Sequence, residues 1–317
     1  MLLRTHFLIS SAISSAAFFS SMAFCQTANV GLPALGYVLD ASGGGQIRPI
    51  TGIPGAALVG QPLTLSFAVS GVATSAQPAL ALASAGAAGN LMLVRDGQAQ
   101  LFEEGSGASA FALSPSGKAV VISRTPDPAT ATMKIWDSLN RAAPTAEASL
   151  PQACPSPKWA VSDDGRRAVA SCTGASALLW FDGQFRLAPI SPAGFSFLPE
   201  SRTGAGLDAA GDLHWLDEDG QLSLLRSGWV ETPLKEKLAV LVTPRWVLAA
   251  AGQTVVRLDR ESAESQRFAC SCPATGLDAM PVSGLVRLTQ AAGPAPVYLF
   301  DAMQGRFWFV PSLEEGQ

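Results

Sequence analysis

The feature that most constrains the fold of this chain is a short apolar run ending in aspartate, which recurs along most of its length. Seven copies occur, "YVLD", "LVRD", "KIWD", "LWFD", "HWLD", "VRLD" and "YLFD", and they end at Asp40, Asp96, Asp137, Asp182, Asp217, Asp259 and Asp301. The steps between these aspartates are 56, 41, 45, 35, 42 and 42 residues. Self-similarity at about 40 residues predicts a repeat architecture, in which each copy is one supersecondary unit.

Each aspartate is followed by a short polar segment and, in most copies, by a second apolar or alternating run. The stretch "LWFDGQFRL", with Asp182 and Gly183 at its centre, shows the pattern most clearly. A two-residue hairpin turn needs positive φ angles, which glycine adopts freely and aspartate tolerates. The same Asp-Gly-Gln recurs at Asp96 and Asp219. Because a catalytic pair has no reason to recur in every unit, we interpret the seven aspartates as structural hairpin turns.

A second type of strand pair precedes several of these hairpins. The clearest copies are "AFALSPSGKAVVIS" at 110–123 and "WAVSDDGRRAVASC" at 159–172, each with a Ser-x-x-Gly turn between two apolar runs. Two hairpins per unit place four strands in about 42 residues, which is the size of one β-propeller blade. The spacing therefore predicts an all-β fold, a propeller of seven four-stranded blades, with six or eight as alternative counts. The first step of 56 residues has room for an inner pair around Leu63 to Val69 and Ala79 to Ala83, in the second unit. Six inner pairs then accompany seven outer hairpins, so the unit at Asp40 is expected to be incomplete.

These repeats resemble the blades of WD-repeat-like and TolB-type propellers, which often carry a "SPDG(K/R)" turn between strands. "SPSGK" and "SDDGRR" are similar to that turn, and "KIWD" is similar to the Trp-Asp ending of a WD repeat. The Gly-His that opens such repeats does not occur in this sequence. The resemblance implies a propeller fold and no particular ligand, because propellers host many unrelated functions.

The first 25 residues have the organisation of a secretory signal peptide. Arg4 supplies a positive charge, residues 7–24 form an apolar stretch, and Ala23 and Cys25 place small residues at the −3 and −1 positions of a cleavage site. We expect cleavage after Cys25, with Ala23 as the alternative site and an uncleaved membrane anchor as the alternative interpretation. Residues 26–317 are then a single propeller domain, secreted or periplasmic. No later apolar run is long enough to span a membrane as a helix.

Four cysteines follow the expected cleavage site, and an even number in an oxidising compartment permits disulfides. Cys154 and Cys172 flank the "SDDG" turn almost symmetrically, so an antiparallel hairpin would bring them nearly opposite one another. They are the candidate disulfide. Cys270 and Cys272 would point to the same face of a strand, where they either pair with each other or remain free.

The sequence shows no recognisable catalytic, cofactor-binding or metal-binding residues. Its two histidines are His6, in the expected signal peptide, and His214, at alternating spacing in a strand, so a multi-histidine metal site or histidine relay is disfavoured. Calcium remains an alternative for the acidic stretches "SDDGRR" and "DEDGQ", although turn chemistry explains both without a cofactor. The net charge of −4, without a basic cluster, does not suggest nucleic acid as a partner.

The sequence therefore predicts a non-enzymatic propeller that binds a protein or a surface polymer, such as a polysaccharide, through loops on one face. A propeller hydrolase or lyase that acts on a sugar or lactone with carboxylates around the central channel is the alternative. A role in envelope assembly is a third hypothesis, which only the TolB-type resemblance implies.

Overall fold

The structure is a computed structural model, and it describes residues 33–42, 44–86, 89–103, 107–125, 131–152, 154, 157–172, 175–231, 238–274, 276–291 and 295–312. The expected signal peptide lies outside these residues. The described residues form 27 strands and no helix. Consequently, no helix in this part of the chain could cross a membrane.

The strands group into seven sheets, numbered here as blades in chain order. The first blade contains β1 Ala34–Asp40, β2 Gln46–Thr51 and β3 Leu58–Val59. The second contains β4 Val69–Thr74, β5 Leu80–Ala85, β6 Asn90–Arg95 and β7 Gln98–Glu103. The third contains β8 Ala108–Leu113, β9 Val120–Arg124, β10 Thr132–Trp136 and β11 Ala146–Ser149. The fourth contains β12 Lys158–Val161, β13 Arg167–Ser171, β14 Leu178–Phe181 and β15 Gln184–Leu187. The fifth contains β16 Pro192–Phe197, β17 Gly204–Asp208, β18 Leu213–Leu216 and β19 Leu222–Arg226. The sixth contains β20 Leu238–Val242, β21 Trp246–Ala251, β22 Thr254–Asp259 and β23 Ser265–Ala269. The seventh contains β24 Asp278–Ala279, β25 Leu285–Arg287, β26 Val297–Asp301 and β27 Arg306–Val310.

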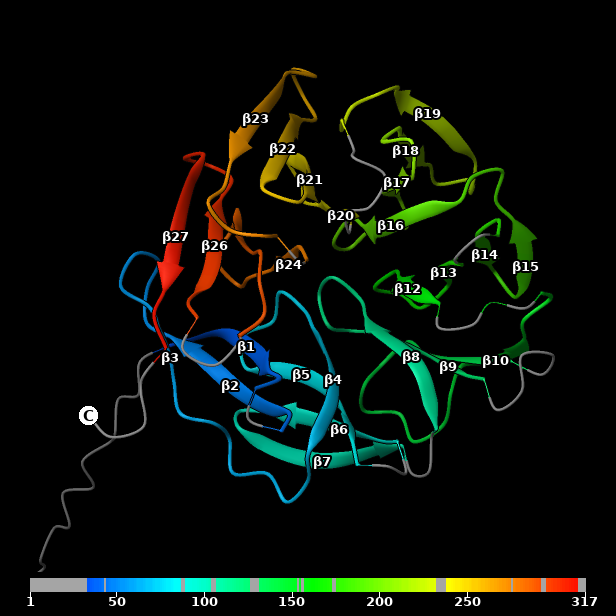
Figure 1. Cartoon of the computed structure of the whole chain (residues 1–317). Helices are drawn as coiled ribbons and strands as arrows, with labels where there is room; N and C mark the ends of the chain where they lie inside the picture. The colour runs from blue at the N-terminus through cyan, green and yellow to red at the C-terminus, as the bar shows by residue number, and fades with distance from the viewer. Residues whose placement is uncertain are drawn as a thin grey trace, which may run out of the picture. The chain divides into compact units, whose positions relative to one another are not determined.

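Within the described residues, each sheet pairs its strands antiparallel in sequence order, six sheets with four strands and the first with three. Figure 1 shows the sheets arranged as blades around a central axis, with β4, β8, β12, β16, β20 and β24 innermost. The predicted seven-bladed propeller is therefore confirmed. In such blades, the turns between first and second strands and between third and fourth strands lie at one end of the ring. We call that end the turn face.

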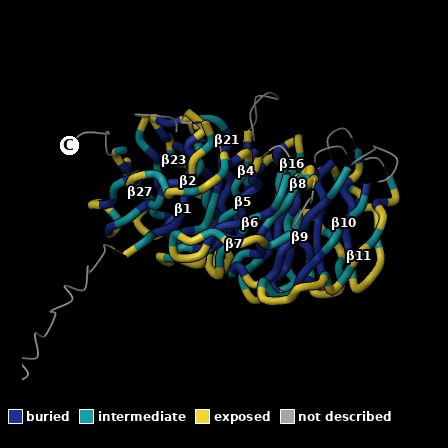
Figure 2. The backbone as a smooth tube through the Cα atoms, turned by 90° about the horizontal axis from the view of Figure 1, so that it is seen from below, coloured by how far each residue is buried: buried dark blue, intermediate teal, exposed yellow. Residues whose placement is uncertain are grey.

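The hydrophobic core lies between neighbouring blades. Second strands are buried along their whole length, as in β5, β13 and β21. Of the fourth strands, β19 is largely exposed, and β7, which Figure 2 labels, has no buried residue. One apolar cluster joins Met133 and Ile135 of the third blade to Val161 and Ala168 of the fourth. Because both faces of these second strands are buried, β5 and β21 are nearly continuous runs of apolar and small residues rather than alternating ones.

The Ser-x-x-Gly turns have a clear chemical basis. The buried hydroxyl of Ser114 accepts hydrogen bonds from the amides of Lys118 and Ala119, both at 3.0 Å. Ser162 accepts from the amide of Arg167 at 3.0 Å in the same way. The serine thus satisfies backbone donors that the turn would otherwise leave unpaired.

The aspartate turns fall into two chemical types. Asp96 and Asp182 have φ angles of 50° and 42° and are followed by glycines with φ of 78° and 97°, the positive values of a two-residue hairpin. In the other type the Oδ1 atom of the aspartate accepts two backbone amides of the turn, as at Asp217, which follows β18, and at Asp259 and Asp301, which end β22 and β26. Asp137 instead pairs with Arg141 at 3.2 Å.

The first blade differs from the expectation in the place of its hairpin. Asp40 ends β1 and forms a parallel bridge with Ala291, which lies between the second and third strands of the last blade. The Val59 amide of β3 donates to Pro311 beyond the outermost strand β27, at 3.0 Å. Hence β1, β2 and β3 correspond to the second, third and fourth strands of a blade, and the Asp40 turn lies opposite the turn face.

Side chains occupy the edge of β1 where an innermost strand would pair. The guanidinium of Arg287 in β25 donates to the carbonyl of Tyr37, to Asp278 Oδ2 of β24 at 2.7 Å and to Thr74 Oγ1 of β4 at 3.5 Å. Gln290 Oε1 accepts from the Leu39 amide at 3.2 Å. Arg287 therefore links the first, second and last blades, and in the described part of the chain it closes the ring beside β1.

One further expectation was wrong in its boundaries. The sequence suggested an inner pair in the second unit over Leu63 to Val69 and Ala79 to Ala83, but the strands are β4 at Val69–Thr74 and β5 at Leu80–Ala85. The Val69 amide, at the start of β4, donates to Gly45 of the first blade at 2.9 Å. This contact between blades sets where β4 begins, and it is not visible in the local sequence pattern.

Candidate functional site

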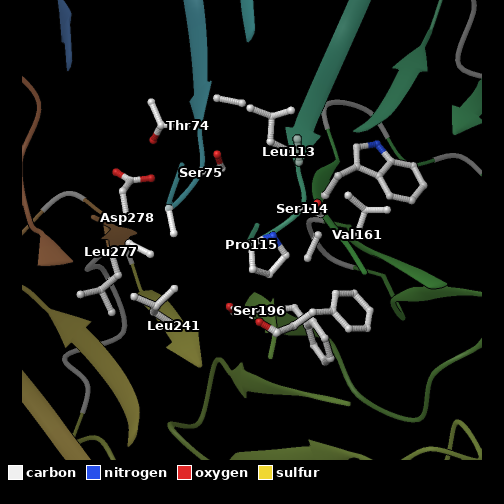
Figure 3. Close-up of a pocket in the computed structure, with 18 of the residues that line it drawn as sticks. Thr74, Ser75, Leu113, Ser114, Pro115, Val161, Ser196, Leu241, Leu277 and Asp278 are labelled. Atoms are coloured by element: carbon white, nitrogen blue, oxygen red, sulfur yellow. Dashed lines mark hydrogen bonds between the residues drawn. The ribbon is translucent and has the colours of Figure 1, made fainter. Parts of the chain in front are cut away.

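A central channel runs between the innermost strands of six blades (Figure 3). Its volume is about 290 Å³, and apolar residue types predominate among its lining residues, although polar and apolar atoms share the exposed lining surface about equally. The lining residues are Val72, Ala73, Thr74, Ser75, Ala76, Phe111, Ala112, Leu113, Ser114, Pro115, Trp159, Ala160, Val161, Phe195, Ser196, Phe197, Val240, Leu241, Leu277, Asp278 and Ala279.

Asp278 is the single ionisable residue among those lining residues. Figure 3 shows its carboxylate on the same side of the channel as Thr74 and Ser75. One carboxylate oxygen accepts from Arg287 at 2.7 Å, and the guanidinium side chain is only 3 % exposed. The described channel lining thus offers one carboxylate, whose charge a buried cation compensates, and not the two that general acid and base roles require.

The channel opens on the turn face into an apolar groove of about 330 Å³. The two cavities share Ala76, Pro115, Leu241 and Ala279, so they form one continuous path. The other lining residues of the groove are Pro199, Val242, Thr243, Pro244, Arg245, Trp246, Met280, Pro281, Ser283, Gly284, Leu285, Val286 and Met303. Four prolines from four different first-to-second-strand turns thus contribute to one groove.

Trp246 and Met303 form the outer part of the groove. A Cβ on Gly284 would lie 2.8 Å from Met303 Cγ and 3.3 Å from the Trp246 ring, so this glycine allows the two side chains to pack closely. The guanidinium of Arg245 lies over Trp246, 5.1 Å from the ring centroid. Met303 is 61 % exposed and the neighbouring Val282 is 38 % exposed. The rim therefore presents apolar side chains directly to solvent.

An acidic pocket of about 380 Å³ adjoins the groove on the same face. Its lining residues are Lys118, Asp163, Asp164, Glu200, Ser201, Arg202 and Glu218. The buried carboxylate of Asp163 accepts from the Ser116 amide at 2.9 Å and from the Glu200 amide at 2.7 Å. It therefore fixes its own turn to the corresponding turns of the blades on both sides.

Ion pairs hold the charged side chains of this pocket. Burial raises the pKa of Asp164, but hydrogen bonds from Ser162, from the Arg166 amide and from Arg202 outweigh it, so the pKa lies below its ordinary value. The hydrogen bond from Lys118 to Glu200 raises the pKa of that exposed lysine. Both groups are accordingly ionised at neutral pH, and the pocket keeps its negative excess.

The residues singled out from the sequence lie outside the channel and the groove. Cys154 and Cys172 are joined with an S–S distance of 2.00 Å, and Cys270 is joined to Cys272. The hairpin aspartates are the last residue of a strand or the residue directly after it, in the turn that leads to the next strand. Among the described residues no three His, Cys, Asp or Glu side chains are grouped so as to hold a metal ion.

Sequence reasoning missed the groove residues. A usable signal was present, because proline is the second residue after the first strand in four units, "LSPSG", "FLPES", "VTPRW" and "AMPVS". The approach of Met303 to Gly284 and Trp246 had no such signal, because it joins different hairpins and a neighbouring blade.

No protein-family model matches this chain, and no curated protein matches its sequence. Among solved structures, it is similar to PorZ, described as an essential bacterial surface component of the type-IX secretion system of Porphyromonas gingivalis. The TM-score is 0.56 at 13 % identity, over 90 % of this chain and 39 % of PorZ. A weaker similarity, with a TM-score of 0.47 at 10 % identity, covers 80 % of this chain and 97 % of an uncharacterized protein from Listeria monocytogenes. The PorZ similarity shows the propeller fold, and this chain spans less than half of that protein's length.

Proposed function

We propose that this chain is a non-enzymatic propeller that binds a protein partner through the groove on its turn face. The observation that carries the proposal is the apolar groove that adjoins the central channel and reaches the rim, where Met303 and Val282 are exposed. Exposed apolar surface beside a preformed groove marks interaction sites in soluble proteins. Methionine suits such a surface because its unbranched side chain adapts to a partner's shape.

The alternative of a sugar or lactone hydrolase or lyase has less support. Such an enzyme requires carboxylates that converge on the reacting bond. In the described channel lining, Asp278 is the single carboxylate, and Arg287 compensates it. The described residues that line the groove include no carboxylate. These two cavities therefore favour binding over hydrolysis.

We also propose a secreted or periplasmic location, in line with the signal-peptide pattern of residues 1–25. The similar structure belongs to a bacterial surface component, which supports an envelope or surface setting by analogy of fold. The resemblance to WD-repeat-like and TolB-type repeats is consistent with this setting, through "SPSGK" and "SDDGRR". A role in envelope assembly would then be one form of the proposed protein binding.

Site-specific photo-crosslinking in the native host tests the proposed function. A photoreactive phenylalanine analogue at Met303 or Val282 should yield a discrete adduct with another protein. The same analogue at Leu187, which is 64 % exposed on the outer strand β15, is the matched control and should yield none. The absence of an adduct at both groove positions, together with turnover of a glycan or lactone that Asp278→Asn abolishes, would overturn the proposal in favour of an enzyme.

A further inference from the structure

We infer that the groove takes an extended segment of the partner protein, in which apolar side chains lie next to lysine or arginine. This inference rests on the proposed function, because it specifies which polypeptide chemistry the turn face selects. The inference is drawn from two adjoining surfaces, of which one is the apolar groove and the other the acidic pocket.

The two surfaces meet at neighbouring residues of the same turns. Pro199 lines the groove and Glu200, the next residue, lines the acidic pocket. Pro115 lines the groove, and the amide of the next residue, Ser116, donates to Asp163 of the pocket. A chain that leaves the groove across these turns therefore passes directly from apolar contacts to carboxylates.

The acidic pocket has a net charge that an occupant can compensate. Its lining holds four carboxylates and two cations, which leaves a formal charge of −2. Each cation is already paired, Lys118 with Glu200 at 3.0 Å and Arg202 with Asp164 at 2.5 Å. A lysine or arginine of the partner would compensate the remaining charge, whereas an acidic side chain would be repelled.

The apolar part of the path suits the rest of such a segment. The groove is mostly apolar and adjoins the channel at Pro115 and Leu241, so an extended chain in the groove can bury several apolar side chains and reach the mouth of the channel. The Pro199 and Pro281 rings present apolar faces without a backbone donor. The partner segment is thus held by side-chain burial, and its basic residue sets the direction in which it lies.

Selection from a library of random peptides displayed on phage tests the inference with the purified mature protein. Peptides that bind the natural protein should be enriched in apolar residues adjacent to lysine or arginine. With the charge-reversed variant Glu200→Lys/Glu218→Lys, this basic enrichment should disappear. Both side chains are exposed, so the change leaves the packing of the ring intact.

The matched control is Glu147→Lys/Glu261→Lys, which makes the same charge change at exposed glutamates outside the pocket. A selected peptide should bind the pocket variant about tenfold more weakly than the natural protein and bind the control variant with unchanged affinity. Met303→Glu should abolish binding of the same peptide, because it places a charge on the apolar rim.

The results separate failure of the inference from failure of the proposed function. A library that yields no binders, or peptides without basic residues, would overturn the inference, while protein adducts at Met303 would still support a protein-binding groove. Equal selection on the natural and the charge-reversed protein would overturn it as well. Crosslinks at Met303 to lipid, to glycan or to a second copy of this chain would overturn both.

Discussion

At the scale of single residues, the repeated motifs of this chain supply what tight turns require, namely acceptors for unpaired backbone amides and residues that tolerate positive φ. A serine hydroxyl pairs the amides of a turn at Ser114 and Ser162, and an aspartate carboxylate does the same at Asp259. Asp182 and Gly183 have a different role, because both adopt the positive φ angles that their two-residue turn requires. The recurrence of aspartate therefore reflects two kinds of turn chemistry, which only the backbone angles separate.

Replacement of Gly183 tests the role of its backbone conformation. No atom lies within 4 Å of a Cβ built at Gly183, so Gly183→Val loses stability through its φ of +97° alone, by about 1–2 kcal/mol. Gly220→Val should cost more, because its Cβ would also overlap the ring of Phe181. Thermal unfolding measures both. Gly183→Asn is the control, since asparagine tolerates positive φ, and equal melting temperatures for Gly183→Val and Gly183→Asn would contradict this account.

At the scale of strands and hairpins, the two disulfides close loops of very different length. Cys154 and Cys172 are 18 residues apart and join the segments that flank β12 and β13, whereas Cys270 and Cys272 are 2 residues apart. A crosslink stabilises a fold largely by restricting the unfolded chain, and this restriction grows with the length of the closed loop. The first bridge therefore constrains a whole hairpin, and the second constrains a single bend.

Replacement of each cysteine pair by alanine should reveal this difference. Cys154→Ala/Cys172→Ala should lower the free energy of unfolding by about 3 kcal/mol, and Cys270→Ala/Cys272→Ala by about 1.5 kcal/mol. Denaturant unfolding of the oxidised proteins provides the measurement, with the reduced natural protein as reference. An equal loss in the two variants would show that loop length does not determine the contribution of these bridges.

Hairpins were the most predictable part of this molecule, because their signals are local. The stretch from Leu179 to Leu187 shows why, since Trp180 and Phe185 face each other across the Asp182 turn with ring centroids 5.0 Å apart. Register between blades was less predictable, as the shifted start of β4 and the place of Asp40 show. The groove was missed for the same reason, because it exists only where turns of several blades converge.

At the scale of the whole molecule, the ring closes through unequal junctions. From β4 to β20 the innermost strands of successive blades lie beside one another. Beside β1, the guanidinium of Arg287 instead supplies the links to Tyr37, Thr74 and Asp278. A buried cation with these partners is costly to remove, because each partner keeps a polar atom without its donor. The Arg287 side chain thus contributes much of the hydrogen bonding between the first and the last blade of the propeller.

Arg287→Met should therefore lower the free energy of unfolding by about 3 kcal/mol. The double variant Arg287→Met/Asp278→Asn should lose less than the sum of the two single changes, since the carboxylate would no longer lack its cation. A double-mutant cycle by chemical denaturation measures this coupling. Arg226→Met, at an exposed position of β19, is the control and should change stability little. Strict additivity at positions 287 and 278 would contradict the role assigned to Arg287.

The groove has a consequence for stoichiometry. A ring of equivalent blades could offer equivalent sites at every junction, and occupancy would then rise in several steps. Here the described groove draws its outer wall from Trp246 and Met303, at the junction of the last two blades, and Gly284 is what lets those two side chains approach. Although the seven blades are similar, this groove occurs at one junction of the described ring. A titration of the protein with its partner should therefore saturate at one partner molecule per propeller.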